Sequence, residues 1–183
     1  MALRSTVYRA DLTVSDLDRH VYGSHALTLA RHPSETEERL MVRLLAFALH
    51  ADEALAFGPG LSTEDEPDLV LRDATGAIEL WIDVGLPDER AVRKACGRAR
   101  RVVVLAYGAR RVDTWCGDNA AAFARLANLS VLTLTGAETE ALQTLAARSM
   151  TLTCTIQDGH VWLASPATTI ELTPAVRVGA GVS

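Results

Sequence analysis

Two aspartates, Asp68 and Asp83, lie toward the open end of what the residue pattern predicts to be a β-hairpin. Apolar residues alternate along segments 68–72 and 78–85, and the DATGA sequence between them is typical of a turn. Shifting the pairing of the two strands by one residue would expose a whole row of apolar side chains to water. In one allowed register, Asp68 lies directly opposite Asp83. Facing residues have Cβ atoms about 4.5–5.5 Å apart, so these carboxylates repel each other unless a proton or a cation lies between them.

A hard divalent cation, Mg²⁺ or Mn²⁺, is the occupant that this pair favours. Mg²⁺ prefers oxygen ligands and is commonly held by one or two carboxylates, with water and phosphate completing its shell. In the alternative interpretation, both aspartates line the wet face of an antiparallel sheet and Arg72 neutralises them. The register predicts one buried row, formed by Leu69, Leu71, Ile78, Leu80, Ile82 and Val84. The opposite row holds Asp68, Val70, Arg72, Glu79, Trp81 and Asp83.

A third acid, Glu38, lies in a helix predicted to open with a capping box formed by Ser34 and Glu37. Glu38 sits at the edge of the apolar arc of this helix, where an unpaired charge is costly, so it is a candidate for the same site. The alternative is a first-turn acid that favours the helix dipole. The apolar arc itself consists of Leu40, Met41, Leu44, Leu45 and Ala48.

Charge is distributed unevenly along the 183 residues, whose net charge is −5. Residues 35–89 hold 14 acidic and 3 basic side chains, whereas residues 90–125 hold 9 basic and 2 acidic ones. This asymmetry is consistent with an acidic pocket beside a surface that attracts phosphate, although such runs are also typical of solvated faces.

The elements that must position these residues predict a single mixed α/β domain, with helices and strands alternating around a mixed sheet. From residue 34 to 107 the order is α-β-β-α-β. The core, at about 34–135, also includes a helix at 118–127 and a strand at 129–135, and a helix at 138–148 follows it. Strands at 6–30 and a hairpin at 150–173, turning at Asp158-Gly159, either extend this sheet or form a second layer.

Composition excludes several classes of protein. The chain is 49% hydrophobic and 22% charged, which is typical of a folded domain, and it has no run of about 20 apolar residues. Its N-terminus lacks the apolar core of a signal peptide, so we expect a cytoplasmic protein without a membrane partner. The three cysteines, 20 and 38 residues apart, fit neither a disulfide framework nor a CxxC metal site.

Long motifs in the chain resemble the YaeQ proteins of proteobacteria. They are ALTLARHPSETEERLMVRLLAF, EPD, ELWIDVGLPDERAVRKAC, FARLANLSV and SMTLTCTIQDGHVWL, and the likeness spans almost the entire chain. The resemblance implies a variant of the PD-(D/E)-XK nuclease fold, whose core is an α-β-β-β-α-β unit. In that fold an aspartate on one strand binds a metal, and an acidic residue stands two places before a lysine on the next strand.

The resemblance also implies site residues. Pro67-Asp68 matches the first half of the nuclease motif and Asp83-Val84-Gly85 the second, except that Gly85 stands where the lysine should be. Glu38 matches an acid of the first core helix. Other branches of the superfamily supply the lysine from the following helix, which here offers Arg90, Arg93 and Lys94.

The helical pattern of that segment places Lys94 away from the core. Its buried face is predicted to hold Val92, Ala95, Cys96 and Ala99, which leaves Lys94 beside Arg90 and Arg98. Three roles stay open for Lys94: the catalytic lysine supplied from this helix, a simple phosphate contact, or a solvated residue. Arg93 is the substitute candidate for the catalytic role.

Two functions follow as expectations. The first is a metal-dependent phosphodiesterase acting on DNA or RNA, in which Asp68 and Asp83 hold the ion, Glu38 orders its water and Lys94 positions water or phosphate. Arg90, Arg93 and Arg98 would then contact the nucleic-acid backbone. The alternative is a nuclease-like scaffold without catalysis that binds nucleic acid or a protein partner in a regulatory role.

Overall fold

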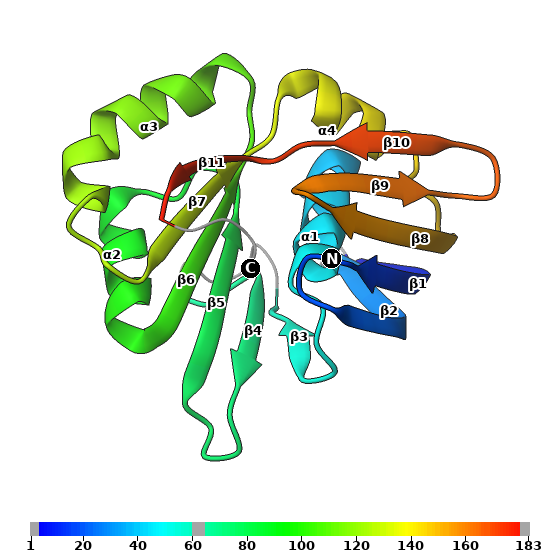
Figure 1. Cartoon of the computed structure of the whole chain (residues 1–183), viewed down its shortest axis with the longest axis horizontal. Coiled ribbons are helices and arrows are strands. Elements are labelled where there is room, and N and C mark those ends of the chain that lie inside the picture. The colour runs from blue at the N-terminus through cyan, green and yellow to red at the C-terminus, as the bar shows by residue number, and fades with distance from the viewer. Residues whose placement is uncertain (1–3, 60–64, 180–183) are drawn as a thin grey trace.

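The computed structural model describes residues 4–59 and 65–179, which form two β-sheets and four helices (Figure 1). The helices are α1 (Glu37–Leu49), α2 (Glu89–Arg98), α3 (Arg110–Phe123) and α4 (Gly136–Gln143). The strands are β1 (Thr6–Asp16), β2 (Val21–Arg31), β3 (Leu55–Phe57), β4 (Leu69–Arg72), β5 (Ile78–Val84), β6 (Ala99–Ala106), β7 (Leu129–Thr133), β8 (Ser149–Gln157), β9 (His160–Ala164), β10 (Thr169–Leu172) and β11 (Ala175–Val178). No helix within these residues is long and apolar enough to cross a membrane.

The N-terminal strands and the C-terminal hairpin form a sheet of their own, with the order β10-β9-β8-β1-β2. The other sheet has the order β11-β7-β6-β5-β4-β3, in which β5, β6 and β7 run parallel. The mixed α/β class is confirmed. Strand β3 was not predicted, because its three residues carry too short a pattern, and it completes the order α1-β3-β4-β5-α2-β6.

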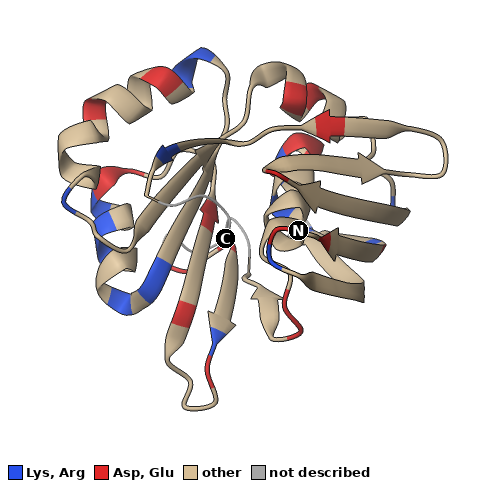
Figure 2. Cartoon of the chain, viewed as in Figure 1, with Lys and Arg blue, Asp and Glu red and all other residues tan. Residues whose placement is uncertain are grey.

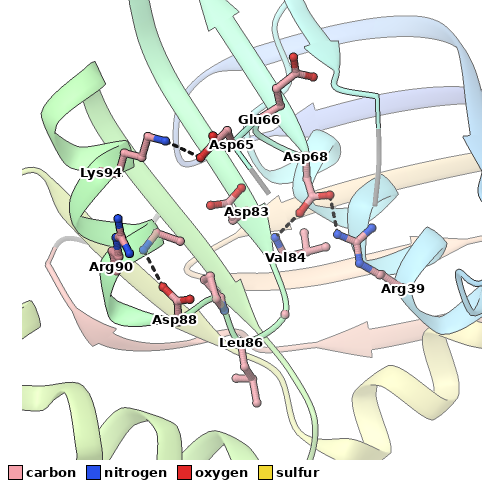
Figure 3. A pocket seen from close by; sticks show the side chains of 13 residues that line it. Arg39, Asp65, Glu66, Asp68, Asp83, Val84, Leu86, Asp88, Arg90 and Lys94 are labelled. Atoms are coloured by element: carbon pink, nitrogen blue, oxygen red, sulfur yellow. Dashed lines mark hydrogen bonds and ion pairs between the residues drawn. The ribbon is translucent and has the colours of Figure 1, made fainter. Parts of the chain in front are cut away.

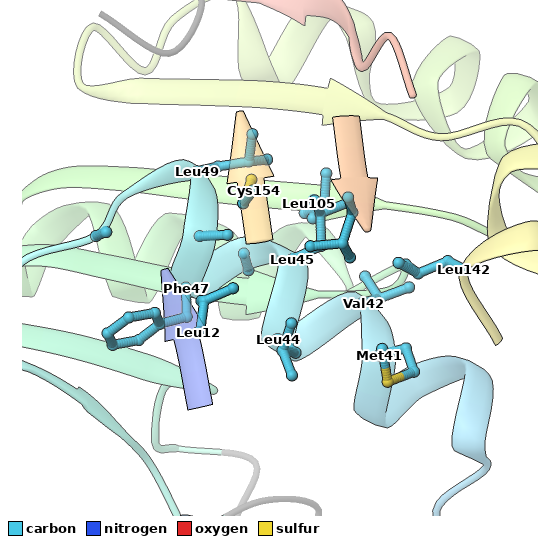
Figure 4. Close-up of a cluster of buried hydrophobic side chains, with 14 of the residues drawn as sticks. Leu12, Met41, Val42, Leu44, Leu45, Phe47, Leu49, Leu105, Leu142 and Cys154 are labelled. Carbon is cyan, nitrogen blue, oxygen red and sulfur yellow. The ribbon is translucent and has the colours of Figure 1, made fainter. Parts of the chain in front are cut away.

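Helix α1 lies between the two sheets and is buried from Leu40 to Leu49 (Figure 4). The predicted arc was therefore too narrow, since a helix covered by sheets on both sides buries all of its faces. Its apolar side chains join one core with residues of both sheets, including Leu12 of β1, Ile82 of β5 and Leu152 of β8. This core ties the two sheets into one unit.

The start of α1 differs from the prediction. Thr36 is the N-cap, and its hydroxyl accepts a hydrogen bond from the backbone N–H of Arg39 at 3.1 Å. The predicted capping box of Ser34 and Glu37 is wrong, because Ser34 precedes the helix and its N–H donates to the ring of His32. A threonine directly before the first helical turn provides the cap instead.

Two later helices also have other bounds than predicted. Helix α3 begins at Arg110 instead of residue 118, and its N-cap, Ala109, makes no side-chain hydrogen bond, so the sequence carries no capping signal there. Helix α4 has a capping box formed by Thr135 and Glu138 and ends at Gln143, before the predicted 148.

The register of β4 against β5 agrees with the prediction. Leu69 faces Ile82 and Leu71 faces Leu80, so the next pair outward is Asp68 and Asp83. The prediction for Ile78 is wrong. A register shift after Leu71 places Ile78 in the second core with Trp81.

The second core shows that the face carrying Asp83 is not a wet sheet surface. Helices α2 and α3 cover it with Val92, Ala95, Val112 and Phe123, and Trp81 is buried beneath them. Helix α2 connects the parallel strands β5 and β6, so its first turn lies near the end of β5 where Asp83 sits (Figure 1). The fold thus places the first turn of α2 beside Asp83.

Gly85, the residue that replaces the lysine of the nuclease motif, ends β5 with φ = 103°. Residues with a side chain rarely adopt this conformation. A Cβ at this position would meet only the Tyr107 ring at 3.9 Å, so backbone conformation and not space excludes other residues.

We predict that Gly85→Ala lowers the free energy of unfolding by about 1–2 kcal/mol, because alanine is strained at positive φ. Gly97→Ala is the matched control, since Gly97 lies in α2 with open space around its Cβ position. That change should leave stability level or raise it by up to about 1 kcal/mol. Urea denaturation of both variants measures the difference, and equal effects would show that the Gly85 backbone is not constraining.

Candidate functional site

A cavity of about 770 Å³ opens beside the end of β5, between α1, β4 and the first turns of α2 (Figure 3). It is lined by Arg39, Asp65, Glu66, Asp68, Asp83, Val84, Gly85, Leu86, Pro87, Asp88, Arg90, Ala91 and Lys94. The cavity therefore brings together both aspartates of the predicted pair and two of the basic residues predicted on α2.

Asp68 is buried, with 6% of its surface exposed, and both of its carboxylate oxygens have partners. Oδ2 accepts a hydrogen bond from the backbone N–H of Val84 at 2.8 Å, and Oδ1 accepts one from Nη2 of Arg39 at 2.6 Å. The charge of Asp68 is thus balanced by α1. Arg72, the neutralising residue of the alternative interpretation, instead donates to the carbonyl of Gly76 at the hairpin turn, so that assignment is wrong.

Asp83 is the electrostatically strained member of the pair. Burial raises the pKa of its carboxyl to about 6, and the nearby charge of Asp68 raises it further. Trp81, the backbone N–H of Asp68 and the charge of Arg39 lower this pKa without restoring the usual value. Near neutral pH this carboxylate is ionised and poorly compensated, which favours a cation beside it.

The basic wall of the cavity comes from α2. Lys94, the only lysine in the chain, pairs with Asp65 at 2.5 Å, and both side chains are more than half exposed. Arg98 donates to the Asp65 carbonyl at 3.0 Å and lies over the ring of Trp81. Basic residues continue along α2 and into β6 (Figure 2), so positive charge extends outward from the cavity.

Three predicted residues, Glu38, Arg93 and Arg98, lie outside the cavity wall. Glu38 of α1 is partly buried but does not line the cavity, whereas its neighbour Arg39 does. Arg93 of α2 is exposed, pairs with Glu89 one turn away and also does not line it.

Sequence reasoning missed a buried ionic network behind the cavity. Arg39 donates to Glu35 at 2.8 Å as well as to Asp68, and Arg43 donates to both oxygens of Glu35 at 3.1 Å. Glu35 and Arg43 are almost fully buried. Positions 35, 39 and 43 are spaced by four residues, and this spacing was the available signal. In the structure, Arg39 and Arg43 share one face of α1 and Glu35 lies just before its N-cap. A charged face on an otherwise apolar helix indicates buried partners.

The acidic residues fit a divalent cation that water and substrate help to hold. Within the described residues, no group of three or more His, Cys, Asp or Glu side chains could hold an ion by itself. Mg²⁺ is often bound by only one or two carboxylates together with phosphate oxygens, and Asp83 with Asp68 meets that requirement. Asp83 is available for this role, while Asp68 must share its Oδ1 with Arg39.

Comparison with known proteins shows close relatives over nearly the whole chain. A family profile described as "YaeQ protein" matches residues 1–174. The "Uncharacterized protein YaeQ" of Salmonella typhi is 48% identical over 172 residues, covering 94% of this chain and 95% of the relative. The protein of the same description from Escherichia coli (strain K12) is 45% identical with the same coverage.

Solved structures agree with the sequence matches. The crystal structure of the YaeQ protein from Xanthomonas axonopodis pv. citri superposes with a TM-score of 0.94 at 53% identity, covering 96% of this chain and 99% of that one. The YaeQ protein from Pseudomonas syringae gives a TM-score of 0.91 at 38% identity, with 96% and 97% covered. The two-sheet arrangement around α1 is therefore shared with these proteins.

We predict that Asp83→Asn raises the free energy of unfolding by about 1–3 kcal/mol at pH 7.5, where the parent carboxylate is ionised in a buried setting. A raised folded-state pKa means that this penalty is present above about pH 6 and fades as the pH falls toward the unfolded value of 3.8. The gain should therefore vanish near pH 4. Denaturant titrations of both proteins at pH 7.5 and pH 4.2 measure it, and a gain that does not depend on pH would contradict the shifted pKa.

Proposed function

This chain belongs to the YaeQ family, and from the residues of its cavity we propose that it hydrolyses phosphodiester bonds of nucleic acid with Mg²⁺ or Mn²⁺ as cofactor. The observation that carries the proposal is the convergence of Asp68, Asp83 and Lys94 on one cavity from three separate elements. The element order α1-β3-β4-β5-α2-β6 also matches the core order that the resemblance to PD-(D/E)-XK nucleases implies.

Asp68 and Asp83 would hold the ion through their carboxylate oxygens. A bound divalent ion stabilises charge on the phosphate and lowers the pKa of a coordinated water. Burial, and then the charge of Asp68, raise the pKa of Asp83 to about 6, and a cation beside this carboxylate would oppose both effects. The N–H of Val84 fixes the orientation of Asp68, because it binds Oδ2 at 2.8 Å.

Lys94 would take the role of the lysine missing at Gly85. A lysine at position 85 would be strained by the positive φ, whereas Lys94 reaches the same cavity from the next helix. Its pair with Asp65 is exposed and therefore weak, so the ammonium group is free to exchange Asp65 for a phosphate oxygen. Arg90, which lines the cavity one helical turn earlier, provides a second phosphate contact.

Arg93 and Arg98 lie on exposed parts of α2 beyond the cavity. We assign them to the phosphate backbone flanking the scissile bond, where side chains contribute to affinity without touching the reacting atoms. Glu38 has no position in the cavity wall, and the proposal gives it no catalytic role.

The second candidate is a scaffold that binds nucleic acid without cleaving it. The observation in its favour is the ion pair of Arg39 with Asp68, which already balances one of the two carboxylates without metal. The two candidates differ in turnover. Both require salt-dependent affinity for nucleic acid, but only the first requires product formation with Mn²⁺ or Mg²⁺.

We predict that Asp83→Asn lowers Mn²⁺-dependent cleavage of DNA or RNA at least about 100-fold, because it removes a charge that faces the ion. Asp68→Asn should have a similar effect. Glu79→Gln, which removes one carboxylate from β5 outside the cavity, is the matched control. Gel assays with folded, purified variants measure the rates. An Asp68→Asn or Asp83→Asn protein that cuts as fast as the parent would rule out this mechanism.

We predict that Lys94→Gln and Arg90→Gln each weaken nucleic-acid binding and each reduce the slope of log affinity against log salt by about 1. Fluorescence anisotropy with a labelled oligonucleotide, recorded at several salt concentrations from about 50 to 200 mM, measures the affinity and its salt slope. Arg125→Gln, a change of equal charge after α3 and outside the cavity wall, serves as the control. Unchanged slopes for both cavity variants would place the nucleic acid elsewhere.

A further inference from the structure

We propose that Arg39 is a built-in substitute for the divalent cation: it neutralises Asp68 while the site is empty of metal, and metal binding releases it to contact the substrate phosphate. The inference rests on the proposed function, because it concerns the same ion, but it makes a separate claim about how a side chain of α1 controls the site.

The first step of the argument is competition for one oxygen. Asp68 Oδ2 is occupied by the backbone N–H of Val84, which cannot move away without disturbing β5. The remaining oxygen, Oδ1, receives Nη2 of Arg39 at 2.6 Å. A cation that coordinates Asp68 through Oδ1 therefore approaches a positive guanidinium nitrogen at contact distance, and the two charges compete for the same carboxylate oxygen.

The second step is the anchor that Arg39 retains. Its other terminal nitrogen, Nη1, donates to Oε1 of Glu35 at 2.8 Å, so the guanidinium would remain paired after losing Asp68. If Arg39 had no second partner, losing Asp68 would leave an unpaired charge in a partly buried place, which is unfavourable. Glu35 makes the exchange possible.

The third step is the rigidity of that anchor. Glu35 has no exposed side-chain surface and also binds Arg43, whose side chain is 1% exposed and which donates in addition to the carbonyl of Ala30 at 3.3 Å. This buried pair holds Glu35 in place whether or not Arg39 contacts Asp68. Arg39 is therefore the movable member of an otherwise fixed network.

The fourth step is where the released nitrogen lies. Arg39 lines the cavity (Figure 3) and keeps 14% of its side chain exposed, whereas the side chain of Arg43 is only 1% exposed. Once Asp68 binds the ion, Nη2 faces the same space as Lys94 and Arg90. Guanidinium groups bind phosphate oxygens well, so Arg39 becomes a third phosphate contact.

The test is the affinity of the protein for Mn²⁺ alone, measured without nucleic acid by the electron paramagnetic resonance signal of free Mn²⁺. Arg39→Gln should bind Mn²⁺ about tenfold more tightly than the parent, because a charge-assisted hydrogen bond to Asp68 no longer competes. Arg72→Gln, which removes the same charge from the end of β4 without contacting Asp68, should change the affinity less than about twofold.

Equal or weaker Mn²⁺ binding by a folded Arg39→Gln protein overturns the inference, and so does a gain of the same size in Arg72→Gln. If the parent cleaves nucleic acid with Mn²⁺ but Arg39→Gln binds the ion no more tightly, only the inference fails. If neither protein binds Mn²⁺, the inference and the proposed function fail together. Tight binding by Arg39→Gln without cleavage by the parent supports the inference and contradicts the proposed activity.

A second measurement uses the parent protein, in case Arg39→Gln does not fold. Nitrogen-15 spectra of the arginine side chains, recorded during titration with diamagnetic Mg²⁺, should show the Arg39 signal changing while the Arg43 signal stays in place. The reason is that Arg43 keeps Glu35 in both states. An Arg39 signal unaffected at Mg²⁺ saturation would show that the guanidinium is not displaced.

Discussion

The burial of one apolar row of the β4–β5 ribbon against α1 is the constraint on which the candidate site depends. Leu69, Leu80 and Ile82 are packed into the core that joins both sheets, so the pairing register cannot slip. The same register forces Asp68 and Asp83 to face each other at the open end of the ribbon. Helix α2 then covers their face, because it connects the parallel strands β5 and β6. A packing requirement thus produces an electrostatic cost.

The two carboxylates are neutralised to different extents. Asp68 is satisfied by the Val84 N–H and by Arg39, whereas Asp83 keeps a carboxyl whose pKa is raised to about 6. Unrelieved strain of this kind is concentrated at functional sites, since selection for stability alone would remove it. Arg39 is the residue that joins the buried ionic network to the cavity. It pairs with a fixed buried carboxylate, Glu35, and with Asp68, which faces the cavity, so it is the side chain that the proposed metal exchange would move.

Much of the site could be predicted from the sequence, and the failures have physical reasons. The facing aspartates and the exposure of Lys94 followed from strand and helix periods, which depend on neighbouring residues only. The interpretation failed at Ile78, because a bulge interrupts the alternation there, and at the start of α1, where Thr36 was the better cap. The alternative interpretation had Arg72 neutralise the aspartates, but the residue that pairs with Asp68 is Arg39, 29 positions away in the sequence. Partners across 29 residues leave no periodic signal.

Local patterns and long shared motifs were enough to predict the family, the mixed α/β class and the basic side of α2. They also allowed the register in which Asp68 faces Asp83. The tertiary structure alone decided that the terminal strands form a separate sheet, that α1 is enclosed between two sheets, and that Arg39 and Glu35 belong to the site while Glu38 lies outside its wall. Glu38 and Arg39 are adjacent in the chain, and only the packing of α1 against β4 and β5 determines which of them points into the cavity. Helix period distinguishes the faces of α1, but it cannot say which neighbouring element each face will meet.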